Sequence, residues 1–301
     1  MTRSKSKSAY IRKLRMVGIM FMIPAGILIL FTTVIPFIWN VYISFGDYNG
    51  VSPYKFTGVD NYIKIFNSRV AMQAIKNSVI VAVTGTLAAM LLGMLMALLI
   101  YRVSKIEGTI FRFLFYSPAM LPMTVVGLLF TFILSSDAGM LNHILQAIGL
   151  GSLAKSWLAT KTLVVVCIGA VQGWRTAGTI MIMVYTAIIA LPNDMFEEAK
   201  LEGATYWQEV RYIIMPLVKP TLVLTFSMMS MWAFKTYDIV AIMTDGGPGD
   251  LSITAPLYIV QQSFRSGKLG YASAISIIFA ALIMAIISAI RFGLRREIHE
   301  F

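Results

Sequence analysis

The sequence predicts an all-α polytopic membrane protein with six transmembrane helices, both termini in the cytoplasm, and a cytoplasmic helix between spans four and five. The first observation is composition: of 301 residues, 58% are hydrophobic and only 13% are charged, and the mean hydropathy is +0.77. Globular domains are about 45–50% apolar and about 25% charged. The second observation is that the apolar residues gather in long runs, and the third is the placement of Lys and Arg between these runs.

Six runs reach the length of about 20 residues with which a helix crosses a bilayer. Four of them contain no charged residue: 16–46, 77–101, 113–136 and 269–290. The other two contain few, because 162–193 holds Arg175 and 220–244 holds Lys235 and Asp238. The first run is longer than the apolar region of a signal peptide, so we expect it to remain as an anchor. The predicted divisions are a basic cytoplasmic tail (1–15), the first transmembrane helix (16–45), an outer loop (46–74), a five-helix core (75–292) containing the cytoplasmic loop 192–216, and a cytoplasmic tail (293–301).

The basic residues between the spans set the predicted orientation. With the N-terminus in the cytoplasm, fifteen Lys and Arg residues lie in cytoplasmic segments and eight lie in outer loops. Cytoplasmic loops of membrane proteins are enriched in Lys and Arg, so this distribution places both termini in the cytoplasm. The net charge of +11 is spread over these loops, so nucleic-acid binding is not expected.

The sequence offers little for catalysis or metal binding. Its single cysteine, Cys167, excludes a disulfide framework, and its two histidines, His143 and His299, lie far apart. The spans hold no histidine or paired carboxylates for acid–base chemistry, so a membrane enzyme is the least favoured alternative. The chain also lacks the G-x-x-x-x-G-K-[ST] loop that binds ATP phosphates. We therefore expect no catalytic residue, no metal and no cofactor in this chain.

The cytoplasmic loop between spans four and five is the most acidic part of the chain. It holds five of the fourteen acidic residues: Asp194, Glu197, Glu198, Glu202 and Glu209. Pro192 and Asp194 predict a helix start, with Asp194 as the N-cap and Glu197 closing a capping box. Gly203 predicts a turn between two short helices, because glycine inside a helix costs about 1 kcal/mol.

An apolar stripe accompanies these acids. Apolar or small side chains recur at three- and four-residue steps, at Phe196, Ala199, Gly203, Trp207 and Val210. A helix with an apolar and an acidic face fits a groove on a soluble, basic partner and fits anionic lipid poorly. The loop is therefore predicted to dock a cytoplasmic protein.

These residues carry a family resemblance. The stretch Glu197–Gly203 (EEAKLEG), followed by Ile213–Pro216 (IIMP), resembles the "EAA…G…I-LP" loop of permease subunits in binding-protein-dependent ABC importers. Phe56–Tyr62 (FTGVDNY) and Thr244–Pro248 (TDGGP) resemble two further elements of that family, in the first outer loop and after span five. Together the three resemble the carbohydrate-uptake class of permeases, and the resemblance covers essentially the whole chain.

The resemblance implies partners and docking roles. Such a permease of the bacterial cytoplasmic membrane pairs with a second, homologous permease and with two ATPase subunits that hold ATP and Mg, and an extracytoplasmic binding protein delivers the sugar or oligosaccharide. Glu197 would bond a basic residue of the ATPase, Ala199 would pack inside its cleft, and Gly203 would permit the bend. Glu198 and Met215 stand where the family usually has Ala and Leu, so Glu198 would affect which ATPase subunit fits.

The ionisable residues inside the spans indicate the solute path. Such residues cost at least about 2.5–3.5 kcal/mol at mid-bilayer, so they usually face a cavity or a partner. By the resemblance, spans four and five line the path, with Arg175, Thr176 and Thr179 on one wall and Trp232, Lys235, Thr236 and Asp238 on the other. Arg175 and Lys235 favour an anionic group on the solute, such as a uronate or phosphate. The structural alternatives are a Lys235–Asp238 pair on one helical face and a salt bridge from Arg175 to another helix or subunit.

Two other transport functions stay open from the sequence. One is an importer of the same family for a glycerol phosphate ester or polyol, and the other is an ion-coupled secondary transporter, which would leave the acidic loop unexplained. Two local predictions complete the reading. Gly169, Gly173 and Ala177, spaced by four, predict close helix packing in span four, and Met140–Ile148 predicts a short helix in an outer loop.

Overall fold

The structure of the protein, a computed structural model, describes residues 2–295 and is helical apart from loops and one two-stranded hairpin. The first half comprises α1 (Thr2–Ile29), the π-helical η1 (Leu30–Val34), α2 (Ile35–Ser44), β1 (Gly46–Asp47), β2 (Lys55–Phe56), α3 (Asp60–Asn67), α4 (Arg69–Tyr101), α5 (Lys105–Met120), α6 (Met123–Ile133), α7 (Met140–Ala147) and η2 (Gly151–Leu153). The second half comprises α8 (Leu163–Ile189), α9 (Asn193–Leu201), α10 (Tyr206–Gln208), η3 (Glu209–Ile214), α11 (Met215–Phe234), α12 (Asp238–Met243), α13 (Ala255–Val260), η4 (Gln261–Arg265) and α14 (Leu269–Arg295).

Five continuous helical stretches are long and apolar enough to cross a membrane, and a bent pair makes a sixth candidate. The five are Arg15–Ser44, Arg69–Tyr101, Leu163–Ile189, Tyr206–Phe234 and Leu269–Ile290. Five of the six predicted runs are thus found as long helices, and a polytopic all-α fold is confirmed. The short outer helix predicted at 140–148 is also confirmed, as α7.

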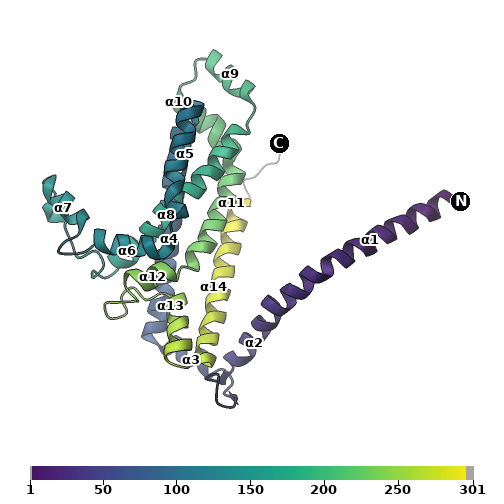
Figure 1. The fold of residues 1–301 in the computed structure, drawn as a ribbon, viewed down its shortest axis with the longest axis vertical. Helices are drawn as coiled ribbons and strands as arrows, with labels where there is room; N and C mark the ends of the chain where they lie inside the picture. Colours follow the sequence, from purple (N-terminus) through teal and green to yellow (C-terminus); the bar gives the residue numbers. More distant parts are fainter. Residues whose placement is uncertain (1, 296–301) are drawn as a thin grey trace.

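The third predicted run, 113–136, is not one helix, and this prediction was wrong. Helices α5 and α6 meet at an angle of 93° across Leu121 and Pro122. The ring of Pro122 disfavours helical backbone at the preceding residue, and Leu121 is extended, with ψ 138°. The chain therefore leaves the direction of α5 at this point, and Figure 1 shows α6 extending sideways from the bundle rather than along it.

The fifth run, 220–244, also differs from its prediction. Helix α11 ends at Phe234, and Lys235 to Tyr237 form a non-helical connection to the short helix α12. Lys235 and Asp238 therefore do not lie on one helical face, and the alternative of a pair between them is not found: the ion pairs among the described residues do not include it.

The close contact of α4 with α8 forms the centre of the bundle. A Cβ added at Gly173 of α8 would lie 2.5 Å from the Cβ of Ala88, and one at Gly93 of α4 would lie 2.7 Å from the carbonyl oxygen of Ala177. Small residues let two helix backbones approach this closely. The prediction of a packing stripe at Gly169, Gly173 and Ala177 is confirmed.

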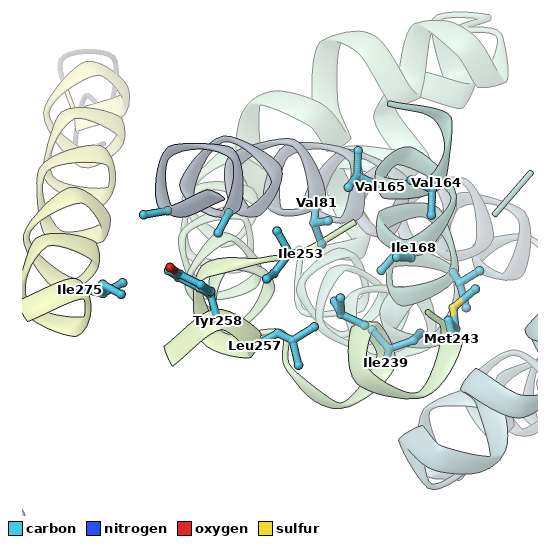
Figure 2. Packing of buried hydrophobic residues seen from close by; sticks show 14 of the residues in the cluster. Val81, Val164, Val165, Ile168, Ile239, Met243, Ile253, Leu257, Tyr258 and Ile275 are labelled. Atoms are coloured by element: carbon cyan, nitrogen blue, oxygen red, sulfur yellow. The ribbon is translucent and has the colours of Figure 1, made fainter. Parts of the chain in front are cut away.

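The largest buried apolar cluster joins α4 and α8 to the last third of the chain (Figure 2). Its labelled members are Val81 of α4, Val164, Val165 and Ile168 of α8, Ile239 and Met243 of α12, Ile253, Leu257 and Tyr258 around α13, and Ile275 of α14. Because α12 contributes three fully or nearly buried side chains, Ile239, Val240 and Met243, this short helix is fixed against α8 rather than free in a loop.

The first helix stands apart from this bundle. Figure 1 shows α1 running away from the other helices, with α2 meeting the bundle beside α14, where the Asn40 amide donates to the Ser276 hydroxyl at 2.8 Å. The described apolar side chains of α1 are exposed to solvent or lipid rather than packed on other helices, as Phe21 with an exposed fraction of 80% illustrates. Helix begins at Thr2, so the predicted basic tail 1–15 is largely helical, whereas the end of the tail 293–301 lies outside the described residues.

Candidate translocation path and docking loop

Arg175, in the middle of α8, binds the break between α5 and α6. Its Nε and Nη2 donate to the carbonyl oxygen of Leu121 at 3.1 and 3.0 Å, and Nη2 also donates to that of Ala119 at 3.2 Å. The last carbonyls of a helix have no partner within the helix, and a cation near them is favoured by the helix dipole. The guanidinium therefore satisfies the end of α5 where the chain turns.

Gln172, one turn earlier on α8, binds the break between α11 and α12. Its buried Oε1 accepts a short hydrogen bond from the Thr236 hydroxyl in the Lys235–Tyr237 connection. We call Gln172, Arg175, Thr236 and the carbonyls of Ala119 and Leu121 the break cluster. Gln172 and Arg175, three residues apart on α8, thus form hydrogen bonds to the break between α11 and α12 and to the break between α5 and α6.

Helices α6 and α12, which follow the two breaks, also pack on each other. A Cβ added to Gly127 of α6 would lie 2.8 Å from Cγ2 of Ile242 in α12. Figure 1 shows both helices at about mid-height of the bundle, with α6 at its left side and α12 next to α6. The break cluster therefore lies where two short helices and α8 meet.

The seven predicted path residues divide by burial. Thr176 and Thr236 are buried, and the Thr176 hydroxyl donates to the Gln172 carbonyl of its own helix at 2.9 Å. Arg175 and Thr179 are half-buried, while the remaining three are exposed, namely Trp232 (48%), Lys235 and Asp238. The hydrogen bond between Gln172 and Thr236 brings the two predicted walls together. Sequence reasoning missed Gln172, for which the only signal was an amide inside an apolar run.

The predicted docking loop forms two short helical pieces at the end of the bundle where α4 ends (Figure 1). Helix α9 begins after Pro192, which offers no side-chain cap, so Asp194 lies in the first turn and the predicted capping box with Glu197 is wrong. Gly203 has φ +79°, a left-handed conformation that favours glycine, and it ends the first piece as predicted. Thr205 and Gln208 form the capping box of the second piece.

The bend at Gly203 splits the predicted apolar stripe. Phe196 and Val210 are buried against the bundle, at 5% exposure each, whereas Trp207 is 70% exposed. A continuous stripe was therefore wrong, because it assumed one helix through the turn. Glu197 and Glu198 are exposed, and Ala199 and Gly203 border a hollow of about 370 Å³ whose remaining lining residues are Glu202, Ala204, Gln208, Glu209, Tyr212 and Ile213.

An ion pair joins the docking loop to the end of α4. Glu209 is 1% exposed, and its Oε2 lies 3.2 Å from Nη2 of Arg102, just after α4. The Arg102 guanidinium lies over the Tyr206 ring, 4.4 Å from its centroid, and the Tyr206 hydroxyl donates to the Leu98 carbonyl at 2.8 Å. Sequence reasoning counted Glu209 only as one of five acids, since nothing local indicates that it is buried.

The two other family-like elements form structured turns at the opposite end of the bundle. The buried Asn61 amide donates to the carbonyls of Ser44 and Gly46 at 3.0 and 2.9 Å, and it thereby fixes the loop after α2. Arg265 binds both carboxylate oxygens of Asp245 at 2.9 and 3.1 Å. These hydrogen bonds raise the pKa of the Arg265 guanidinium above its ordinary value. Within the described residues, no three His, Cys, Asp or Glu side chains gather as a metal site.

Comparisons with known proteins agree with this architecture. Residues 89–298 match the family described as "binding-protein-dependent transport system inner membrane component". The chain is 31% identical to the "Probable ABC transporter permease protein YurN" of Bacillus subtilis over 90% of this chain and 94% of that protein. It is 27% identical to the "Sulfoquinovosyl glycerol transport system permease protein SmoG" of Agrobacterium fabrum over 90% of this chain and 88% of that protein.

A solved structure shares the fold. It is the crystal structure of a bacterial ABC transporter involved in the import of the acidic polysaccharide alginate, with a TM-score of 0.82, 22% identity, and coverage of 98% of this chain and 100% of the matched chain. The family match covers more than two thirds of the sequence and includes α8, the docking loop and both helix breaks. The chain is therefore a multi-pass membrane protein that belongs to the inner-membrane permease components of binding-protein-dependent ABC transport systems.

Proposed function

We propose that this chain is the translocation subunit of an ATP-driven importer for a sugar or oligosaccharide in a bacterial cytoplasmic membrane. Family membership carries the proposal, and similarity to a permease named for sulfoquinovosyl glycerol transport and to the structure of a transporter involved in alginate import supports a saccharide as solute. The chain itself is non-catalytic in this proposal, because ATP and Mg are held by two separate ATPase subunits. A second permease and an extracytoplasmic binding protein complete the assembly.

The docking loop lies in the cytoplasm in this proposal, and so do both termini. The excess of Lys and Arg in the segments on that side supports the orientation. The exposed carboxylates of Glu197 and Glu198 meet basic side chains of an ATPase subunit, and Ala199 and Gly203, at the rim of the hollow, let its surface approach closely. The exposed Trp207 adds an apolar anchor beside these charges.

The solute passes beside the break cluster. Trp232, Lys235 and Asp238 are the path residues with exposed side chains, and they offer a ring for stacking on a sugar and two charged groups for its polar substituents. Arg175 and Thr179 are half-buried at the margin of this path. Thr176 and Thr236 support the wall from within, because both hydroxyls already donate hydrogen bonds inside the chain.

Affinity purification of the chain from solubilised membranes tests the docking part of the proposal. The native chain should bring down a second permease and a subunit that hydrolyses Mg-ATP, and Glu197→Lys should lose the ATPase. Asp137→Lys, an equal charge change at an exposed residue of an outer loop, is the matched control and should retain it. A chain that purifies alone and moves solute without ATP would instead be a secondary transporter.

A further inference from the structure

The break cluster lies on the same helix that leads directly into the docking loop. Helix α8 ends at Ile189 and α9 begins at Asn193, so three residues separate them. A displacement of α9 should therefore move α8 as well, because helices are stiff and the connection between the two helices is short. Arg175 and Gln172 lie on α8 about four and five turns before its end at Ile189, since 3.6 residues make a turn.

The hydrogen bonds of the break cluster connect α8 to the start of α6 and to the start of α12. Arg175 holds the last carbonyls of α5, where α6 begins, and Gln172 holds the hydroxyl of Thr236, where α12 begins. Arg175 binds backbone carbonyls at the end of α5, and Gln172 binds the buried hydroxyl of Thr236. Because these groups have few other partners, removing either side chain leaves polar groups in the bundle without a hydrogen bond. Helices α6 and α12 also contact each other at Gly127 and Ile242.

We propose that Gln172 and Arg175 are positioning residues that make α6 and α12 move with α8 as one gate when the docking loop moves. This inference rests on the proposed function, since it requires an ATPase to displace α9. Neither side chain needs to touch the solute. The buried Oε1 of Gln172 faces Thr236, and the Nε and Nη2 donors of Arg175 face the end of α5. Coupling of this kind needs an element with two arrangements that both sites bias, and in this proposal the gate formed by α6, α8 and α12 is that element.

Two distances within one chain test the proposal. Both use spin labels in a Cys167→Ser background of the purified permease–ATPase complex, measured with and without Mg-ATP. The first pair, Met284→Cys of α14 with Leu201→Cys of the docking loop, reports docking-loop motion. The second pair, Met284→Cys with Phe132→Cys of α6, reports gate motion, and all three labelled residues are exposed, at 62%, 88% and 73%.

In the native sequence, ATP should change both distances. In Gln172→Leu and Arg175→Ala, the first change should persist while the second falls to less than about half of its native size. The double variant Gln172→Leu/Thr236→Val removes both ends of one hydrogen bond without leaving either unpaired, so it keeps the fold and should still lose the gate motion. Arg175→Lys retains one donor near the carbonyls and should restore part of it.

Thr186→Val is the matched control, because Thr186 is exposed on the same helix and its hydroxyl donates to the Ile182 carbonyl of that helix. It should leave both ATP-driven changes intact. The proposal is overturned if the second distance responds fully to ATP in Gln172→Leu/Thr236→Val and in Arg175→Ala. If the first distance does not respond even in the native chain, the docking loop is not driven by ATP, and the proposed function fails instead.

Discussion

Removing the Arg102 side chain should destabilise the protein, because it leaves a buried carboxylate without its cation. Glu209 is 1% exposed, and Oε2 accepts from Arg102 at 3.2 Å while Oε1 has no hydrogen-bond partner among the described residues. A hydrogen bond to a charged group contributes about 1.5–3 kcal/mol, and a partly exposed cation–π contact adds about 0.5–1 kcal/mol. Half of the Arg102 side chain is exposed and screened by solvent, so we expect Arg102→Ala to cost about 2–3 kcal/mol.

A double-mutant cycle measured by thermal unfolding in detergent separates the pair from its parts. Arg102→Ala should lower the melting temperature by several degrees, at about 2–4 °C per kcal/mol. Arg102→Met combined with Glu209→Leu removes both charges and should recover most of the loss, because a buried ion pair can often be replaced by apolar side chains at little cost. The reasoning is refuted if Arg102→Ala unfolds within about 0.5 kcal/mol of the native chain, or if the effects of Arg102→Met and Glu209→Leu, each made singly, add up to that of the double variant without coupling.

Three further substitutions test the packing, the first outer loop and the docking surface. Gly173→Val should prevent α4 and α8 from packing and reduce the yield of folded protein, whereas Gly26→Val, with nothing within 4 Å, should not; equal yields in size-exclusion chromatography would contradict this. Asn61→Ala leaves two carbonyls unbonded and should cost about 1–3 kcal/mol in thermal unfolding, and an unchanged melting temperature would show that the loop is held otherwise. Trp207→Ala should change stability by less than about 0.5 kcal/mol but weaken ATPase co-purification, and undiminished capture would exclude Trp207 as an anchor.

Much of the fold could be predicted from charge spacing alone. Runs with no more than two charged residues marked five of the long helices, because a charged side chain inside the bilayer is costly. The small residues at Gly169 and Gly173 predicted the packed face of α8 correctly, since only they permit the observed backbone approach. Gly203 also predicted the turn in the docking loop correctly, because the turn requires the positive φ that glycine adopts without strain.

The errors arose where tertiary contacts decide the structure. The length of the third run predicted one helix, whereas Pro122 inside it is the local signal of the break. The end of α11 had no such signal: the connection Lys235–Tyr237 contains no Gly or Pro, and it is instead held by the hydrogen bond from Thr236 to Gln172 on another helix. The partners of Arg175 were equally hidden, because they are backbone carbonyls distant in sequence.

Uptake by sealed vesicles tests the central claim most directly. The native chain, purified with its partner subunits and reconstituted with the binding protein, should accumulate a labelled saccharide only when Mg-ATP is supplied on the side of the docking loop. A panel of lactose and an acidic alginate oligosaccharide, with glycerol for comparison, would identify the solute class. ATP-dependent accumulation of a saccharide is the predicted result, and accumulation that proceeds equally well without ATP, driven by an ion gradient, would contradict the account.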